Sequence, residues 1–442
     1  MRFSVIIPTY NRSYQLMLTL TAFEKQTYPL DQFEVIVVND GSVDNTLERL
    51  NQYQAQAPYR LLFTSLSHTS GRSMARNVGV AAAKEDYIIF CDSDFLVTPD
   101  FISVHAKYHE EKPLIASGIP NMWRNIYTQI HADFSEQEKV AAAHILRPSG
   151  LWSEHYFNTP DTIDLVTQDH VRNQTIPLDS IIMPWDIDDV GKVQYCSTDV
   201  SPWLLSVTRN MSLPKKVFLQ VGGFNDKFQE NGFEDWELGY RLHRTGYNFV
   251  SIQEMIGYHQ QHPQSYRNSD GPDQNLKFVY ESHGFEDPEL SILSICAPWD
   301  SIILYKDALR IIKSWQKSKH SVYRNASRKL NHACTRSAEL YYEDRHSPAY
   351  QHGLTVLKEA FIAMNELFVQ DQSEHNQQEM VRIASHACSK LSVSKAPKVS
   401  KVRKIRKVHK IRKVHKLRGI RKLRKIRKTR KLHNVRKLRI VF

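Results

Sequence analysis

Cysteine is scarce in this sequence, and its few copies stand far apart. The five residues form no close pair and no metal-ligand spacing (Cys91, Cys196, Cys296, Cys334 and Cys388). An odd, dispersed set argues against a disulfide framework and favours ordinary thiols in a reducing compartment. No apolar run approaches the roughly 18 residues that cross a bilayer, and the opening MRFSVIIPTYNR lacks the apolar core of a signal peptide. These absences predict a soluble cytoplasmic chain, and they leave peripheral contact with the inner face of the membrane open.

Acidic residues are absent from the end of the chain. After Glu379 there is no Asp or Glu, and residues 381–442 carry 25 Lys and Arg. The preceding residues hold the other 34 basic side chains against 47 acidic ones, so the net charge of +12 averages an acidic body and a basic tail. This asymmetry indicates a polyanionic partner for the tail.

The tail, residues 396–442, repeats every three residues. Lys, Arg and His fill most positions between the recurring apolar residues, which are Val402, Ile405, Val408, Ile411, Val414, Leu417, Ile420, Leu423 and Ile426. Three residues of an α-helix turn through about 300°, so such a stripe would wind around the helix and would not form one apolar face. Repulsion among the many positive charges predicts that the free tail is disordered. Its candidate partners are an anionic membrane surface, an acidic glycan or wall polymer, and nucleic acid. The apolar residues favour the membrane, whereas the lack of base-stacking aromatic residues between Lys401 and Leu438 argues against specific nucleic-acid binding.

Apolar runs alternate with helical patterns over the first 91 residues. The predicted strands are Phe3–Ile7, Phe33–Val38, Tyr59–Ser65 and Tyr87–Cys91, and the predicted helices are Ser13–Lys25, Asp44–Tyr53 and Gly71–Lys84. This order predicts an α/β fold with a mostly parallel, Rossmann-like sheet. Ligands gather at the carboxyl ends of such strands, and polar clusters follow three of them: Pro8-Thr9-Tyr10, Asn39-Asp40-Gly41-Ser42 and Asp92-Ser93-Asp94.

The rest of the chain is less regular in pattern. Residues 120–200 mix aromatic and acidic residues with little periodicity, which predicts an elaborated loop region over the site. Regular structure is expected again over Val217–Met255, and the pattern becomes helical in Ala308–Trp315 and Leu354–Leu367. We therefore expect a first domain over residues 1–270, a helical module over residues 290–392 and the basic tail.

Two acidic groups are the candidates for chemistry. Asp92-Ser93-Asp94 follows a buried strand, where a carboxylate pair can hold Mg²⁺ or Mn²⁺ against a diphosphate. Glu234 and Asp235 begin a predicted helix, where unpaired backbone N–H groups favour anions. Each group also has a plainer interpretation, because such triplets are usually turn caps and a carboxylate at a helix start is often only a cap.

Six motifs in register decide between these interpretations. They are VIIPTYNR, VVNDGSVDNT, GRSMARNVGV, IIFCDSD, VGGFNDKF and GFEDWELGYR. In order and spacing they resemble the family 2 glycosyltransferases of the GT-A fold, over roughly residues 1–260. The last two also resemble the carboxyl half shared by galactosyl- and N-acetylgalactosaminyl-transferases, including bacterial chondroitin-type polymerases. The resemblance implies a nucleotide-diphospho-sugar transferase fold and Mn²⁺ or Mg²⁺ as cofactor.

The resemblance also assigns the donor site. Pro8, Thr9 and Tyr10 would line the nucleotide-base pocket, Asp40 would contact the base, and Arg76 would lie near it. Asp92 would face the ribose and the metal, with Ser93 in the same nucleotide-sugar site. From the residues alone, Asp40 remains a candidate for turn chemistry and Arg76 for an ion pair on its helix.

The same resemblance assigns the catalytic and metal residues. Asp94 and His259 would be metal ligands together with Asp92, although His262 competes with His259 for that role. Asp235 would be the general base on the acceptor hydroxyl, and Glu234 would hold the acceptor or donor sugar. Trp236 and Trp203 suit either a sugar platform or the core.

These assignments predict a metal-dependent inverting glycosyltransferase that moves a sugar, UDP-linked by preference, to a glycan or cell-envelope acceptor. No Gln-x-x-Arg-Trp motif accompanies the other motifs, which predicts non-processive transfer. The alternative is a catalytically idle scaffold that binds a surface polymer and is anchored by its tail. The intact Asp92, Asp94 and Asp235 favour the enzyme. The sugar, the acceptor and the oligomeric state do not follow from the sequence.

Overall fold

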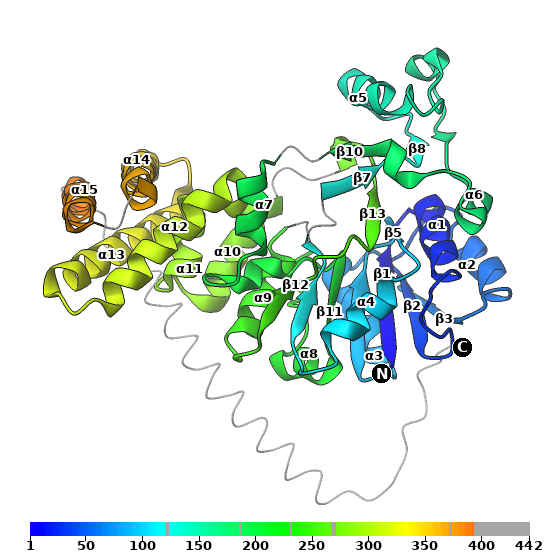
Figure 1. Cartoon of the computed structure of the whole chain (residues 1–442), viewed down its shortest axis with the longest axis horizontal. Helices are drawn as coiled ribbons and strands as arrows, with labels where there is room; N and C mark the ends of the chain where they lie inside the picture. The colour runs from blue at the N-terminus through cyan, green and yellow to red at the C-terminus, as the bar shows by residue number, and fades with distance from the viewer. Residues whose placement is uncertain (120–122, 185–186, 230–231, 267–270, 371–372, 393–442) are drawn as a thin grey trace, which may run out of the picture. The chain divides into compact units, whose positions relative to one another are not determined.

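The computed structural model describes residues 1–119, 123–184, 187–229, 232–266, 271–370 and 373–392 (Figure 1). Residues 1–391 form one compact unit. The basic tail, residues 396–442, lies outside the described residues, so the predictions of its disorder and of its partner stay predictions.

A seven-stranded sheet forms the centre of the fold, in the order β12-β6-β11-β4-β1-β2-β3. Strands β4, β1, β2 and β3 run parallel, whereas β11 is antiparallel to both β4 and β6. The central strands are buried throughout because they are runs of Val, Ile and Phe covered on both faces. The bounds are β1 Phe3–Thr9, β2 Phe33–Asn39, β3 Arg60–Ser65, β4 Tyr87–Cys91, β6 Ile115–Ser117, β11 Asn210–Pro214 and β12 Phe249–Ser251. The predicted α/β fold with a mostly parallel sheet is confirmed.

A second, smaller sheet lies beside the first and has the order β10-β7-β13-β5. Its antiparallel pair β13–β5 sets His259 opposite Phe95, the residue after Asp94. The backbone N–H of Gln260 also donates to the carbonyl oxygen of Asp94 at 2.8 Å. The bounds are β5 Phe95–Val97, β7 Arg124–Ile126, β10 Ile182–Pro184 and β13 Gly257–Gln260, with a separate pair β8 Gln129–Ile130 and β9 Ile163–Asp164.

The helices of the first half agree with the sequence pattern where that pattern was regular. The first three helices and first four strands begin and end within two residues of the predicted positions. The bounds are α1 Ser13–Phe23, α2 Thr46–Gln54, α3 Arg72–Ala82, α4 Phe101–Tyr108, α5 Glu136–Leu146, α6 Gln168–Asn173, α7 Asp189–Cys196, α8 Lys215–Val221 and α9 Glu234–His243.

The interpretation of residues 120–200 as loops is wrong for the residues that the structure describes. This segment carries α5, α6, α7 and several short strands. The helices have 11, 6 and 8 residues. The two shorter ones span about two turns each, which is too little for a clear apolar period to emerge from the sequence.

The last part of the described chain is helical (Figure 1). Its helices are α10 Gly271–His283, α11 Pro288–Ser291, α12 Pro298–Lys317, α13 Ser321–Asp344, α14 Pro348–Gln370 and α15 Glu374–Ser392. Helix α12 packs against α7, α13 and α14, and Lys306 of α12 donates to the backbone oxygen of Ser197 at 2.7 Å. The division into a domain over residues 1–270 and a helical module over residues 290–392 remains a prediction.

Two further observations concern the sequence-based expectations. All five cysteines are separate thiols in the structure. Among the described residues, none of the helices combines the length and the apolar character needed to cross a membrane.

Glycine 239 of α9 provides a test of how tightly this helix is held. A Cβ at Gly239 would stand 2.7 Å from the carbonyl oxygen of Trp203 and 2.2 Å from Ser206 Oγ. Gly239→Ala should therefore lower the free energy of unfolding by about 1–3 kcal/mol, measured by urea unfolding.

The matched control is Gly353→Ala in α14, where the new Cβ would meet its nearest atom at 3.7 Å. This substitution should be neutral or stabilise the protein by up to about 1 kcal/mol, because alanine is the better helix former. Equal effects at the two positions would contradict the close packing of α9.

Candidate active site

A pocket of about 480 Å³ opens at the carboxyl ends of β1 and β4. Its volume falls in the range of small-molecule sites. All nine residues predicted to bind the nucleotide sugar and the metal line it: Pro8, Thr9, Tyr10, Asp40, Arg76, Asp92, Ser93, Asp94 and His259. None of the described residues between 123 and 200 lines this pocket, and the expectation that this segment lies over the site stays a prediction.

Asp40 fixes the loop that leads into α3. Its carboxylate accepts hydrogen bonds from the backbone N–H groups of Ser70 at 2.7 Å and Gly71 at 2.9 Å. Gly71 has φ +88°, and a Cβ there would lie 3.1 Å from Cα of Gln229. Asp40 thus stabilises a turn through backbone hydrogen bonds, which is the alternative role that the sequence left open for it. Each oxygen retains a lone pair, because a carboxylate offers about four acceptor sites.

Arg76 joins the two acidic groups that the sequence singled out. It projects from α3, is 2% exposed, and donates to Asp92 at 2.9 Å. Its guanidinium also lies 3.4 Å from Asp235 and 3.6 Å from Glu234. Burial opposes the charge, but Asp235, Asp92 and Glu234 together raise the pKa of Arg76, so it stays protonated. The structure therefore ties Arg76 to three carboxylates, none of which lies on its own helix, so the predicted ion pair within that helix is not what forms. The same guanidinium brings Asp235 close to Asp92.

Asp235 stands in the first turn of α9 with its carboxylate held in place. It accepts from the backbone N–H of Thr208 at 3.0 Å and from its hydroxyl at 2.6 Å. Burial and the neighbouring charge of Glu234 raise the pKa of Asp235 to about 6, against the opposing effects of Arg76 and Thr208. A carboxylate with a pKa near neutrality is suited to general-base chemistry.

Glu234 is engaged differently from its neighbour. It is 4% exposed, and it accepts from the backbone N–H of Gly232 at 2.8 Å. It also pairs with Arg72 and Arg76, both at 3.6 Å. These contacts fix the turn before α9 and hold the buried Glu234 side chain beside Asp235.

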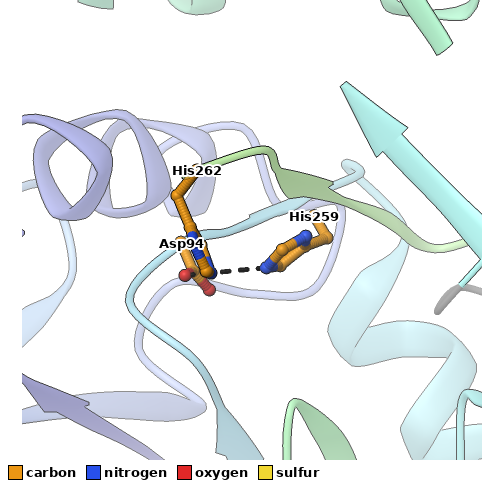
Figure 2. A group of neighbouring side chains, drawn as sticks. All are labelled: Asp94, His259 and His262. Atoms are coloured by element: carbon orange, nitrogen blue, oxygen red, sulfur yellow. Dashed lines mark ion pairs between the residues drawn. The ribbon is translucent and has the colours of Figure 1, made fainter. Parts of the chain in front are cut away.

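Asp94, His259 and His262 form a compact set of possible metal ligands (Figure 2). One ligand atom from each lies within 4.8 Å of the others. His259 Nε2 lies 3.7 Å from Asp94 Oδ2, and its Nδ1 lies 3.1 Å from Asn125 Oδ1, a contact that fixes the ring. Both histidines that competed in the sequence thus reach Asp94. Asp92 is outside this set, because its carboxylate is bound by Arg76, so the structure does not group it with the metal ligands.

Asp94 and His262 have protonation states that fit a bound cation. Burial lowers the pKa of His262 to about 4, so its imidazole is neutral near pH 7. Burial would raise the pKa of Asp94, but the charge and hydrogen bond of His259, with Arg12 nearby, hold that pKa well below its usual range. One carboxylate and two imidazoles suit Mn²⁺ better than Mg²⁺, which prefers oxygen ligands.

Besides Arg76, three arginines line the pocket (Arg12, Arg72 and Arg209), and none of them was predicted as a site residue from the sequence. The guanidinium of Arg12 lies 5.2 Å from the ring centroid of Tyr266, which is stacked at 14° on His262. Arg209 Nε lies 3.9 Å from Asp92 Oδ2. Arg12 belonged to the VIIPTYNR motif and could have been found there, whereas Arg209 carries no local signal. Cations beside a metal set suit the phosphates of a nucleotide.

The two tryptophans proposed as sugar platforms lie in different environments. Trp203 is 1% exposed and its indole N–H donates to Glu289 at 2.6 Å, so the platform interpretation is wrong for it. Its burial is possible because its indole N–H has a buried hydrogen-bond acceptor. Trp236 is partly exposed, and one face of its ring is stacked on Trp299 at 5.4 Å and 12°.

Comparisons with known proteins identify this arrangement. The model of "Glycosyl transferase family 2" matches residues 4–133, and that of the "N-terminal domain of galactosyltransferase" matches residues 206–264. The uncharacterized glycosyltransferase YfnE of Bacillus subtilis (strain 168) is 31% identical over 290 residues, which are 64% of this chain and 71% of that protein. The chain belongs to the family 2 glycosyltransferases.

More distant relatives share a smaller part of their length. A validoxylamine A glucosyltransferase of Streptomyces hygroscopicus subsp. jinggangensis is 28% identical, covering 60% of this glycosyltransferase and 56% of that protein. A chondroitin synthase of Escherichia coli is 25% identical, covering 59% and 35%. The solved structure of S. aureus TarS 1-349 with UDP-GlcNAc aligns at 13% identity over 88% and 91% of the two chains, with a TM-score of 0.43. The fold assignment rests on the sheet topology and the family matches.

Arg76 provides a test of the acidic cluster. Arg76→Met would leave three buried or partly buried carboxylates beside one another without a counter-charge. We expect it to cost about 3–5 kcal/mol of unfolding free energy at pH 7.5, measured with urea.

Arg72→Met is the matched control from the same helix. The Arg72 side chain is 43% exposed and lies 3.6 Å from Glu234, so its loss should cost no more than about 1 kcal/mol. If the two variants unfold alike, Arg76 does not hold the cluster together.

Proposed function

We propose that this protein is a metal-dependent inverting glycosyltransferase. It would move a hexosyl or N-acetylhexosaminyl group from a nucleotide-diphospho-sugar to a glycan or cell-envelope acceptor. The observation that supports the proposal is that Arg76, which lines the pocket containing Asp94, His259 and His262, also lies 3.4 Å from Asp235, a carboxylate with a raised pKa that is not itself among the lining residues.

The donor half of the pocket would be built from the carboxyl ends of the strands. Pro8, Thr9 and Tyr10 would border the nucleotide base, and the free lone pairs of Asp40 would accept from it. Asp92 and Ser93 would face the ribose. Asp94, His259 and His262 would hold Mn²⁺ or Mg²⁺, which neutralises the charge on a leaving diphosphate when bound. Arg12 and Arg209 would add positive charge to the same phosphates.

The acceptor half would be organised by α9. The acceptor hydroxyl attacks C1 of the donor sugar, the bond from C1 to the diphosphate oxygen breaks, and the hydroxyl proton passes to Asp235. No covalent bond to the enzyme is needed, so one displacement inverts the anomeric configuration. Thr208 and Arg76 hold the carboxylate in position before the substrate arrives, and positioning of this kind supplies much of the rate.

A UDP-sugar is the favoured donor. Chondroitin synthases and a glucosyltransferase are among the relatives, which supports a hexose or an N-acetylhexosamine as the transferred group. The absence of a Gln-x-x-Arg-Trp motif supports transfer of one or a few sugars. We further propose a cytoplasmic protein whose basic tail binds an anionic membrane surface or an acidic polymer.

The metal set is tested by donor binding in the full chain. UDP with Mn²⁺ should raise the melting temperature of the wild type more than UDP or Mn²⁺ alone, because a ligand that binds only the folded state stabilises it. His262→Ala and Asp94→Asn should lose the extra shift from Mn²⁺ and keep most of the shift from UDP alone.

Donor hydrolysis separates the enzyme from an idle scaffold. A panel of UDP- and GDP-sugars should include at least one that the wild type hydrolyses with Mn²⁺. Failure of the whole panel in both hydrolysis and thermal shift would leave the idle scaffold as the explanation.

The pH dependence of transfer tests Asp235 as the base. The raised pKa of Asp235, about 6, means that the carboxylate is ionised and active above pH 6 and becomes protonated as the pH falls through that value. The rate should therefore drop about tenfold between pH 7.5 and pH 5. Asp235→Asn should lose roughly 10²–10⁴-fold in turnover while the thermal shift with UDP and Mn²⁺ is retained. A pH profile flat to pH 5 would exclude this assignment.

A further inference from the structure

A second pocket, of about 430 Å³, lies on another side of the start of α9. Phe233, the residue before this helix, contributes to its wall, and helices α10, α12, α13 and α14 supply most of the rest. We call it the Trp299 pocket, after the aromatic residue at its edge. All of its lining residues except Phe233 follow residue 264, where the second family match ends.

Trp299 has the features of a fixed aromatic platform. Its side chain is 51% exposed, although large aromatic residues are usually covered. Trp236 stacks on it at 5.4 Å and 12°, and Phe233 packs edge-on at 5.1 Å. These two rings hold the indole in place and leave the rest of its surface to the pocket and the solvent. A rigid, exposed indole offers a large contact area at little entropic cost to a ligand with an apolar face.

The polar groups around Trp299 favour a neutral, hydroxyl-rich ligand. Asp300 and Lys358 line the pocket and contribute one carboxylate and one ammonium group to it. Asp273 is already bound by the hydroxyl of Tyr341 at 2.6 Å and by Arg345. Negative carboxylates and positive ammonium and guanidinium groups line the same pocket. Neither a polyanion nor a polycation is therefore complementary to the whole surface.

The first turn of α9 connects this pocket to the acidic cluster. Phe233 lines the Trp299 pocket, and Asp235, two residues later, pairs with Arg76 beside the donor pocket. Two residues of any chain span no more than about 7 Å between their Cα atoms. Trp236 follows Asp235 directly and carries the stack on Trp299. A chain of sugars that presents its terminal hydroxyl to Asp235 would therefore find the Trp299 platform close by.

We propose that the Trp299 pocket binds the acceptor glycan, at the sugars that precede the one receiving the new residue. The inference rests on the proposed function and adds the acceptor class, which is a neutral oligosaccharide stacked on Trp299 with its hydroxyl groups on Asp300 and Lys358. Donor recognition then lies within the family-matched segments, and acceptor recognition lies in the helices beyond them.

The test is a calorimetric titration of the full-length chain with five hexasaccharides. Three are neutral (N-acetylchitohexaose, cellohexaose and maltohexaose), and two are anionic (chondroitin and hyaluronan hexasaccharides). The wild type should bind at least one neutral hexasaccharide with a Kd below about 1 mM, and UDP with Mn²⁺ should not displace it. Trp299→Ala should weaken this binding by about tenfold or more.

Trp299→Phe is the matched variant, because it keeps an aromatic face on the Trp236 stack. Its affinity should stay within about threefold of the wild type, and the melting temperatures of both variants with UDP and Mn²⁺ show whether they fold. The proposal is overturned if no neutral hexasaccharide binds, if only anionic ones bind, if Trp299→Ala binds as the wild type does, or if UDP competes.

The two proposals fail in different ways in this design. If UDP and Mn²⁺ do not raise the melting temperature of the wild type, the proposed transferase function is contradicted. Hexasaccharide binding is measured separately and does not depend on that result. A normal shift and normal donor hydrolysis, with no effect of Trp299→Ala on glycan binding, would keep the transferase and remove the acceptor pocket.

Discussion

The buried guanidinium of Arg76 is the contact on which the arrangement of this site depends. It projects from α3 and pairs with Asp92 at the end of β4 and with Glu234 and Asp235 at the start of α9. Removing a charge from water costs several kcal/mol unless partners compensate for it, and here three carboxylates do so. The same contacts keep the pKa of Asp235 from rising further. One side chain therefore joins the end of β4 to the start of α9 and lowers the pKa of the proposed base relative to the value that burial alone would give.

A second constraint is the pairing of β13 with β5. The strands are short, but their register sets His259 beside Asp94, and the turn after β13 returns His262 to the same carboxylate. A set of possible metal ligands is thus assembled by backbone pairing between segments about 160 residues apart in the chain. Burial keeps His262 neutral, so a cation would not have to displace a proton from it.

The helix α9 connects the chemistry to the helical part of the chain. Its first turn carries Glu234 and Asp235 toward Arg76, while Phe233 and Trp236 contact Trp299 of α12. Farther along, Glu237 is paired with Arg241 at 2.7 Å and with His283 of α10 at 2.8 Å. The helix is anchored to both sides, and this rigidity suits a residue that must hold a carboxylate in one position. The family models match residues 4–133 and 206–264, and the helices beyond residue 264 lie outside both matches.

The sequence alone determined the regular half of this protein. Runs such as Phe33–Val38 and motifs such as IIFCDSD are local signals, so the alternating strands and helices, the polar strand ends and the family resemblance could be read without coordinates. The segment 120–200 was misjudged because its elements are too short to establish a period. Only the tertiary structure decided that Arg76 pairs with three carboxylates. It also decided that His262 lies with His259 in the set of possible metal ligands, whereas Asp92 is not in that set. It buries Trp203 and leaves Trp299 exposed. Those outcomes depend on contacts between residues distant in sequence, where burial and competing partners select among side chains that look equivalent in the sequence.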